Sequence, residues 1–281
     1  MKLYSRVLFC AAGFLFLLVL ADSGLCEGEI TRIADGKLIG FAGMIEDIKG
    51  SSIVFAGELH DSREHHRIQL DVIKALHKAG VPLAIGLEMF DSENQPALDQ
   101  WVAGKMELLD FVQIYRQNWT IPWPMYDSIL LYARNNGIPL IALNVPRDIV
   151  QKVYRSGVSS LSVEEKKVLP PDITCRIDAP YMKFIKSIYA GHLTEGSSLE
   201  YFCEAQLLRN KTMAWYLMAY LKKNPQRLVV VLTGVGHAMK RGVPEEIPRE
   251  SGLRYRVIIP QLSEPAMDTL KKSDADYLIA Q

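Results

Sequence analysis

The chain has 281 residues and a formal net charge of zero, with 32 basic and 32 acidic side chains. This balance provides no electrostatic footprint for nucleic acid, so we expect no nucleic-acid partner. Hydrophobic residues make up 49% of the chain and charged residues 23%, which argues against general disorder and allows one sizeable core.

Residues 1–25 have the pattern of a secretory signal peptide. Lys2 and Arg6 precede an apolar run over residues 7–21, and small or polar residues follow it. The run is shorter than the roughly 20 residues that a transmembrane helix needs. A retained N-terminal anchor helix is the alternative. We therefore expect an exported protein of the periplasm or cell envelope.

The positions of the cysteines bear on whether the exported protein is lipidated or forms a disulfide. Cys26 lies directly after the predicted signal peptide, where a lipid anchor could attach it to a membrane. Leu25 occupies a position where a lipoprotein signal has a small residue, which argues against lipidation. Cys175 and Cys203 could form a disulfide in an oxidising compartment.

From residue 52 onward, apolar runs alternate with amphipathic segments. This pattern predicts an α/β fold with a mostly parallel central sheet and helices on both faces. Pro-rich residues 157–197 predict a helical insertion, so residues 26–281 would form a single domain with that insertion. We expect strands at 53–57, 83–87, 139–143, 228–232 and 255–259, an edge strand at 277–279, and long helices at about 62–78, 125–136 and 198–223.

Four polar residues follow the predicted strands. Glu58 and His60 come after the first, Glu88 after the second and His237 after the fourth. Because ligands of open α/β sheets bind outside the carboxyl ends of the strands, we expect these side chains to share one crevice. Two imidazoles and two carboxylates suit a divalent metal such as Zn, Mn or Fe, or an acid/base set in which a Glu orients a His. Taken singly, each is more simply a capping, paired or turn residue.

Three further stretches bear on this crevice. Residues 63–67 place cations and histidines in the first turns of a helix, where an anionic ligand or a solvated charged face is possible. Arg209, in the middle of a long helix, could reach Glu58 or Glu88, or lie on the surface. Residues 234–237 resemble a dinucleotide fingerprint but lack its third glycine, so we reject that interpretation.

The segment 119–126 combines aromatic residues with prolines. Trp123 and Tyr126 could wall an apolar pocket or form a dimer contact. The alternative is an ordinary packed loop.

Several motifs together resemble the ChaN family of haem-binding, iron-regulated lipoproteins. That family belongs to a superfamily with the Tiki metalloproteases, the TraB/PrgY proteins and the erythromycin esterases. The motifs are Gly57–Asp61, His65–Gln69, Gly86–Phe90, Arg209 with Met213 and Ala214, and Gly234–His237. The resemblance implies an α/β fold with helical insertions, export, and haem held non-covalently between two protomers.

The resemblance also implies roles for individual residues. A tyrosine would ligate the iron, for which Tyr126 is preferred over Tyr115, Tyr181 and Tyr189 because of its aromatic, proline-stiffened setting. A histidine would contact the propionates, with His65 and His66 as candidates. From the hydrolytic branches, a metal-binding or catalytic role carries over to Glu58, His60, Glu88 and His237, with Arg209 in the catalytic set.

Two functions follow from these expectations. The first is a homodimeric haem-binding protein of iron uptake, with envelope uptake machinery as a further partner. The alternative is a metal-dependent hydrolase that uses the same crevice. A weaker third is an interaction protein that keeps the crevice as a scaffold. The chain has no C-x-x-C-H motif, so covalent c-type haem is excluded.

Overall fold

The computed structural model describes residues 29–170, 186, 198–262 and 272–280. The predicted signal peptide, Cys26 and most of the predicted helical insertion lie outside these residues. So do Cys175, Tyr181 and Tyr189, and the proposed disulfide is therefore not described. Its other partner, Cys203, is buried in the core.

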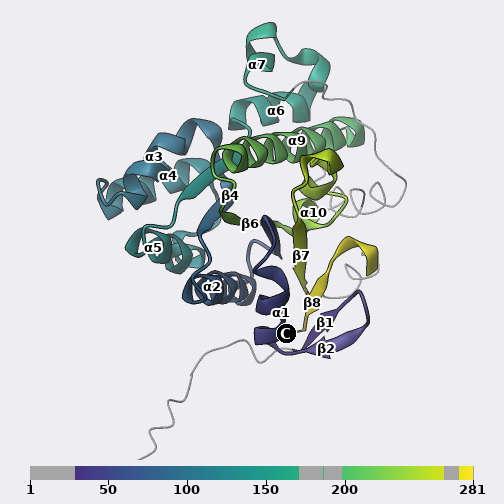
Figure 1. Cartoon of the computed structure of the whole chain (residues 1–281). Coiled ribbons are helices and arrows are strands. Elements are labelled where there is room, and N and C mark those ends of the chain that lie inside the picture. Colours follow the sequence, from purple (N-terminus) through teal and green to yellow (C-terminus); the bar gives the residue numbers. More distant parts are fainter. Residues whose placement is uncertain (1–28, 171–185, 187–197, 263–271, 281) are drawn as a thin grey trace, which may run out of the picture.

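One mixed sheet organises the described residues (Figure 1). Its strand order is β2-β1-β8-β7-β3-β6-β4-β5. The strands from β8 to β5 pair in parallel, whereas β1 is antiparallel to both β2 and β8. The mostly parallel α/β fold predicted from the sequence is confirmed. The strands are β1 (Ile30–Arg32), β2 (Lys37–Ile39), β3 (Ile53–Glu58), β4 (Leu83–Asp91), β5 (Leu140–Asn144), β6 (Leu228–Gly234), β7 (Tyr255–Pro260) and β8 (Tyr277–Ile279).

The prediction that residues 277–279 form an edge strand is wrong. β8 lies inside the sheet, because β1 pairs with its free side and β2 then forms the edge. These two strands have three residues each, and all but Ile30 are at least partly exposed. They therefore carry no apolar run that sequence reasoning could find.

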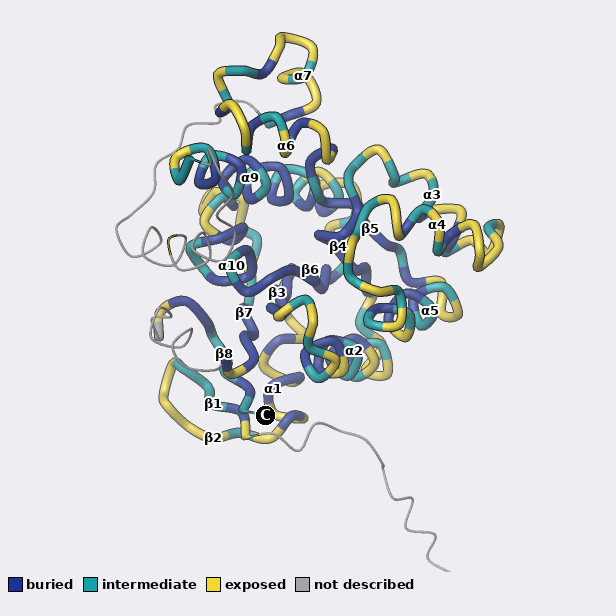
Figure 2. Tube along the Cα trace, turned by 180° about the vertical axis from the view of Figure 1, so that it is seen from behind, coloured by how far each residue is buried: buried dark blue, intermediate teal, exposed yellow. Residues whose placement is uncertain are grey.

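Helices cover both faces of the sheet (Figure 1). α1 to α5 pack against one face in a core that includes Val54 and Ala56 of β3. α9 and α10 pack against the other face, on Ile53 and Phe55. Successive strand residues point to opposite faces, so β3 and β6 are buried along their whole length (Figure 2).

The helices are α1 (Phe41–Ile48), α2 (Arg63–Lys78), α3 (Gln95–Val102), α4 (Leu108–Asn118), α5 (Asp127–Asn135), α6 (Arg147–Ser156), α7 (Val163–Lys167), α9 (Leu199–Lys223) and α10 (Val235–Ala238). Short 3₁₀ helices span Ser92–Asn94, Trp123–Met125, Val158–Ser160, Val243–Glu246, Arg249–Ser251 and Lys272–Asp274. α6 packs on α9 through a smaller cluster that includes Val153 and Leu208. Within the described part of the chain, no helix is long and apolar enough to cross a membrane.

Two serines define the starts of the long helices. The Ser62 hydroxyl accepts a hydrogen bond from the backbone N–H of His65, and Ser198 does the same for Tyr201. Such N-caps satisfy N–H groups that have no partner within the helix. Both starts confirm the helices predicted from residue 62 and residue 198.

Candidate functional site

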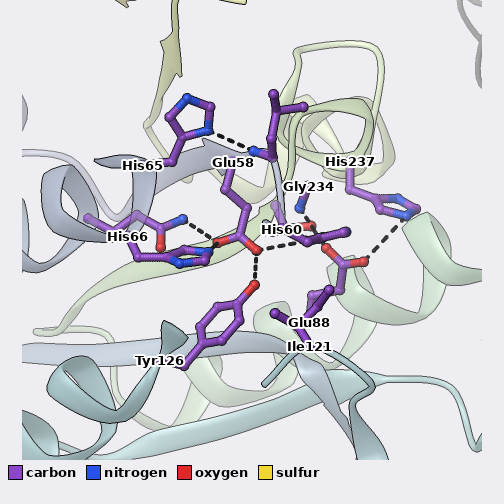
Figure 3. Close-up of polar contacts among 12 residues, drawn as sticks. Glu58, His60, His65, His66, Glu88, Ile121, Tyr126, Gly234 and His237 are labelled. Carbon is purple, nitrogen blue, oxygen red and sulfur yellow. Dashed lines mark hydrogen bonds and ion pairs between the residues drawn. The ribbon is translucent and has the colours of Figure 1, made fainter. Parts of the chain in front are cut away.

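The site lies where β3, β6 and β4 end side by side (Figure 3). Glu58 is the last residue of β3, Glu88 lies in β4, and His237 belongs to α10, which directly follows β6. The predicted convergence of these residues is present. One detail differs, because β4 continues to Asp91 and Glu88 therefore lies inside the strand rather than after it. The β4–β5 register shifts between Leu87 and Asp91, next to this position.

Glu58 is buried and accepts hydrogen bonds from several elements. Its Oε1 lies 2.7 Å from Nδ1 of His60 and accepts a bond from the Tyr126 hydroxyl. Its Oε2 accepts a bond of 2.8 Å from Nε2 of Gln69. Nε2 of His66 lies 3.4 Å from the same oxygen. Both carboxylate oxygens are thus occupied by groups of the chain itself.

These neighbours keep Glu58 ionised. Burial alone would raise the pKa of its carboxyl, but His60 and His66 outweigh that effect and lower the pKa to about 2. In return the pKa of His60 lies above its usual value, although burial acts in the opposite direction, because Glu58 and Glu88 favour the charged imidazolium.

Glu88 forms a second buried centre. Nη2 of Arg209 donates to its Oε1 at 2.5 Å, while the Thr233 hydroxyl and the backbone N–H of Gly234 donate to Oε2. Burial alone would raise the pKa of Glu88, but the charge of Arg209 and the other donors hold it well below the usual range. The sequence-based expectation that Arg209 reaches the crevice is confirmed for Glu88.

His237 completes this side of the site. Its Nε2 lies 3.8 Å from Oε1 of Glu88, and its Nδ1 is 2.5 Å from Oδ1 of Asn210 on α9. Burial, aided by the charges of Arg209 and His60, lowers the pKa of His237 to about 3, although Glu88 acts in the other direction. The imidazole is therefore neutral at pH 7.

The structure does not support the prediction of a divalent metal held by Glu58, His60, Glu88 and His237. The described residues contain no group of three or more His, Cys, Asp or Glu side chains arranged to hold a metal ion. The physical reason is that hydrogen bonds within the chain already use the carboxylate oxygens. Arg209 moreover places a positive charge where a cation would have to bind.

His65 and His66, the predicted contacts of the haem propionates, lie in the first turn of α2. Both side chains are buried. Nδ1 of His65 accepts a hydrogen bond of 2.8 Å from the backbone N–H of Leu59, and it thereby holds the turn after β3. The ring of His66 packs on that of Tyr126, with 4.2 Å between the ring centroids.

Tyr126, the predicted iron ligand, also lies inside the fold. Only 1% of the residue is exposed, and its hydroxyl donates to Glu58. Burial and the charge of Glu58 raise the pKa of the phenol. Tyr115 is similarly buried, and its hydroxyl donates to the backbone carbonyl of Ile121 at 2.8 Å.

His60 is the accessible member of the site. Its side chain is 36% exposed, and the ring of Trp119 lies nearly perpendicular to the imidazole, with 5.0 Å between the ring centroids. The imidazole also lies close to Gly234, where an added Cβ would be 3.1 Å from Nε2. The adjacent Leu59 is 42% exposed. The imidazole of His60 therefore lies next to exposed apolar surface.

Sequence reasoning did not identify four polar residues that hold this site together. Gln69 contacts Glu58, Thr233 contacts Glu88, and Asn210 contacts His237. Asn144 accepts a hydrogen bond from Arg209 and donates one to the backbone carbonyl of Glu88. The sequence gives an indication of such a role only for Gln69 and Asn210. Each is a polar residue on the buried side of its helix, where it needs a partner.

The family model described as "Haem-binding uptake, Tiki superfamily, ChaN" matches residues 44–247, a range that contains every residue of the site. A solved structure with similar fold is described as cofacial heme binding to ChaN of Campylobacter jejuni. It has a TM-score of 0.72 and 19% identity, and the match covers 90% of this chain and 96% of that one.

An erythromycin esterase mutant, EreC H289N in its open conformation, has a TM-score of 0.51 at 15% identity, with 90% of this chain and 81% of that one covered. Among curated proteins, the chain is 25% identical over 282 residues to Protein RETICULATA-RELATED 5, chloroplastic, of Arabidopsis thaliana. That match covers 90% of this chain but only 38% of the longer relative.

Proposed function

Because the chain belongs to the ChaN family of haem-binding uptake proteins in the Tiki superfamily, we propose that it binds haem non-covalently as the cargo of haem uptake. The observation that supports this proposal within the chain is the setting of His60. The partly exposed imidazole lies next to exposed Leu59 and the ring of Trp119, and it so combines a polar contact with the apolar surface that a porphyrin needs.

The direct test is a titration of the purified mature protein with hemin, followed by the Soret band. We expect saturable binding in the wild type and a changed band with weaker binding in His60→Ala. The matched control is His77→Gln, because His77 lies on α2 outside the crevice, with Nδ1 2.9 Å from the Tyr132 hydroxyl. No saturable spectral change in the wild type would refute haem binding.

Dimerisation is the second part of the proposal. Face-to-face haems, as the description of the Campylobacter jejuni protein states, need two binding sites that meet. The exposed Leu59 beside His60 is apolar surface that a second copy could cover. Sedimentation of the mature protein with and without hemin tests this, and a monomer under both conditions would overturn it.

Export to the periplasm or cell envelope is the third part, supported by the basic and apolar pattern of residues 1–25. Intact mass of the protein isolated from its cells tests it. Cleavage within residues 19–26 is the expected result, and added lipid mass on Cys26 would identify an anchor. A chain that retains Met1 would contradict cleavage of a signal peptide and would favour the retained anchor helix. A partner in envelope uptake machinery is sought by crosslinking the exported protein in cells.

The Glu58–His60 pair favours hydrolysis as a second candidate function. A histidine oriented by a carboxylate can act as a general base, and this would need no metal. The test is turnover of ester and peptide substrates by the wild type, His60→Gln and Glu58→Gln, with and without a chelator. Activity that survives chelation but disappears in His60→Gln supports this function, whereas loss on chelation restores the metal-dependent alternative.

A further inference from the structure

A second pocket, at the end of the sheet away from the crevice, has charged walls that the proposed function does not use. Its volume is about 350 Å³, and it is lined by Arg32, Ala34, Asp47, Arg256, Asp276 and Tyr277. We propose that it binds a small monocarboxylate that also carries a hydrogen-bond donor, as a hydroxy acid or an amino acid does. Arg256 would hold the carboxylate of this ligand, and Asp47 would accept a hydrogen bond from the donor.

The pocket is separate from the crevice. Arg256 pairs with Val54 near the start of β3, whereas Glu58 is the last residue of that strand. Four residues of a strand span roughly 13 Å, and β8, which carries Tyr277, lies two strands away from β3. The pocket therefore lies at the amino ends of the parallel strands, and the inference does not depend on haem binding.

The alternation of side chains along the strands brings the polar groups of the pocket to one face of the sheet. Ile30, Ile258 and Ile279 belong to the core on the side of α1 to α5. The strand residues of the pocket each lie two positions from one of these and therefore point to the same face: Arg32, Arg256 and Tyr277. α1 lies beside β1 and β8 (Figure 1), and its last turn supplies Asp47.

Carboxylates of the chain itself bind the guanidinium of Arg32. Its Nε and Nη2 donate to Asp35 at 3.1 and 2.9 Å, and its Nη1 donates to Asp47 at 2.9 Å. The carboxylate of Asp35 also lies 3.7 Å from Nζ of Lys37. Two positive and two negative charges therefore balance on this side of the pocket.

Within the described residues, Arg256 has no carboxylate partner. Its Nη1 donates to the backbone carbonyl of Tyr255 at 3.0 Å. The carboxylate of Asp276 instead binds Lys240 at 2.7 Å and the backbone N–H of Val257 at 2.8 Å. A guanidinium has five N–H donors, and their fork matches the two oxygens of a carboxylate. The single positive charge left over at the pocket suits a ligand with one negative charge better than a phosphate dianion.

Asp47 provides the second contact for the ligand. Its Oδ2 accepts from Arg32 and, at 3.3 Å, from the hydroxyl of Tyr277, which is buried. In the part of the chain that the structure describes, Oδ1 of Asp47 has no partner. An ionised carboxylate only accepts hydrogen bonds, so a ligand group that binds this oxygen must be an O–H or an N–H. For this reason the proposed ligand carries a hydroxyl or an ammonium group.

The experiment is a titration of the purified mature protein, followed by the ¹H–¹⁵N resonances of arginine side chains and by the Tyr277 ring. The probes are propionate, lactate, alanine and inorganic phosphate. The first three have the same carbon skeleton and carry no donor, a hydroxyl or an ammonium beside the carboxylate. We expect a saturable shift of the Nε–H of Arg256. Lactate or alanine should bind about fivefold more tightly than propionate, since one hydrogen bond gives a factor of that order.

Three variants assign the contacts. Arg256→Gln should lower the affinity for all three carboxylates at least about tenfold, measured at the Tyr277 ring, because hydrogen bonds to charged groups are the stronger ones. The matched control is Arg254→Gln, since Arg254 is exposed and its Nη2 donates to the backbone carbonyl of Gly50 at 2.7 Å. Asp47→Ala should abolish the preference for lactate or alanine over propionate.

Several results would overturn the proposal. No saturable shift with any carboxylate up to about 10 mM would refute the site, as would equal losses of affinity in Arg256→Gln and Arg254→Gln. Tighter binding of phosphate than of all three carboxylates would refute the class of ligand, and equal binding of the three would refute the contact with Asp47. If Arg256→Gln does not fold, Arg256→Lys replaces it. That variant keeps the charge but lacks the fork, so an unchanged affinity would contradict the role of Arg256.

Discussion

The guanidinium of Arg209 donates to the carboxylate of Glu88 at 2.5 Å, although 121 positions separate the two residues in the chain. Arg209 comes from α9 and Glu88 from β4, so the pair joins one helical layer to the sheet. Only 1% of the Glu88 side chain and 16% of the Arg209 side chain are exposed. This is a buried ion pair, and its two members depend on each other.

Arg209→Met should strongly destabilise the protein. It leaves the Glu88 charge buried without a cation, and removing one member of a buried pair costs about 3–5 kcal/mol. Urea unfolding followed by circular dichroism measures the loss. The exposed pair of Lys167 and Glu164, with Nζ 2.7 Å from Oε1, serves as the control, since Lys167→Met should cost less than about 1 kcal/mol.

The double variant Glu88→Gln with Arg209→Met provides the second comparison. Removing both charges should recover part of the stability lost in Arg209→Met, because no uncompensated charge remains. If Arg209→Met costs no more than Lys167→Met, the pair does not stabilise the fold.

The centre of this fold could be predicted from the sequence because its strands are buried on both faces. β3, β4 and β6 are visible as continuous apolar runs, and each leads directly to a polar side chain or a glycine turn. Parallel pairing then brings Glu58, Glu88 and His237 to one edge of the sheet. The β1–β2 hairpin could not be predicted in this way. Its residues show no apolar pattern of a strand, and β1 is recognised as a strand only because it pairs with β8 and β2.

The chemistry of the site was less predictable than its location. Glu58 and Glu88 have the residue types of metal ligands, but their oxygens accept hydrogen bonds from Gln69, Tyr126 and Arg209. Those donors lie on or directly before three helices, and tertiary packing determines which carboxylate each donor reaches. The aromatic setting of Tyr126 suggested an iron ligand, but nothing in the sequence indicated that its buried hydroxyl would donate to Glu58.

Gly234→Ala should weaken hemin binding without unfolding the protein. The added Cβ would lie 3.0 Å from Cε1 and 3.1 Å from Nε2 of His60, so the imidazole must move by a few tenths of an ångström. We expect about a tenfold rise in Kd, equivalent to about 1.4 kcal/mol. Hemin titration measures this rise. Gly40→Ala is the control, since its Cβ would meet no atom within 4 Å. Equal affinities of the two variants would contradict the expected contact.

Protonation of His237 should destabilise the protein below about pH 6.5. Its pKa is about 3 in the folded state and about 6.5 when unfolded, so the unfolded chain binds more protons between these values. The stabilisation is therefore present above pH 6.5 and is lost as the pH falls. Between pH 7.5 and pH 5 the expected loss is about 2 kcal/mol.

Urea unfolding of the wild type and of His237→Gln at both pH values isolates this effect. The pKa of His60 is raised, so its contribution has the opposite sign: it is present below pH 6.5 and is lost as the pH rises through its folded pKa. Taking the difference between wild type and variant removes most of that contribution. A difference that does not change with pH would show that His237 is not held neutral.

Gly242→Ala should disrupt the loop that carries His237. An added Cβ would lie 2.3 Å from the carbonyl oxygen of His237 and 2.7 Å from that of Gly236. These are backbone atoms, which cannot rotate away as the end of a side chain can.

The loop has little freedom to move away from this methyl group. Asp274 accepts from Nε of Arg241 at 2.7 Å, and Lys240 lies 2.7 Å from Asp276, so the residues before Gly242 are fixed to the C-terminal part of the fold. We expect Gly242→Ala to cost about 1–3 kcal/mol and to weaken the bond between His237 and Asn210. Urea unfolding and the His237 ring resonances measure the two effects. Gly50→Ala is the matched control, since its Cβ would meet nothing within 4 Å, and equal stability of both variants would contradict the steric argument.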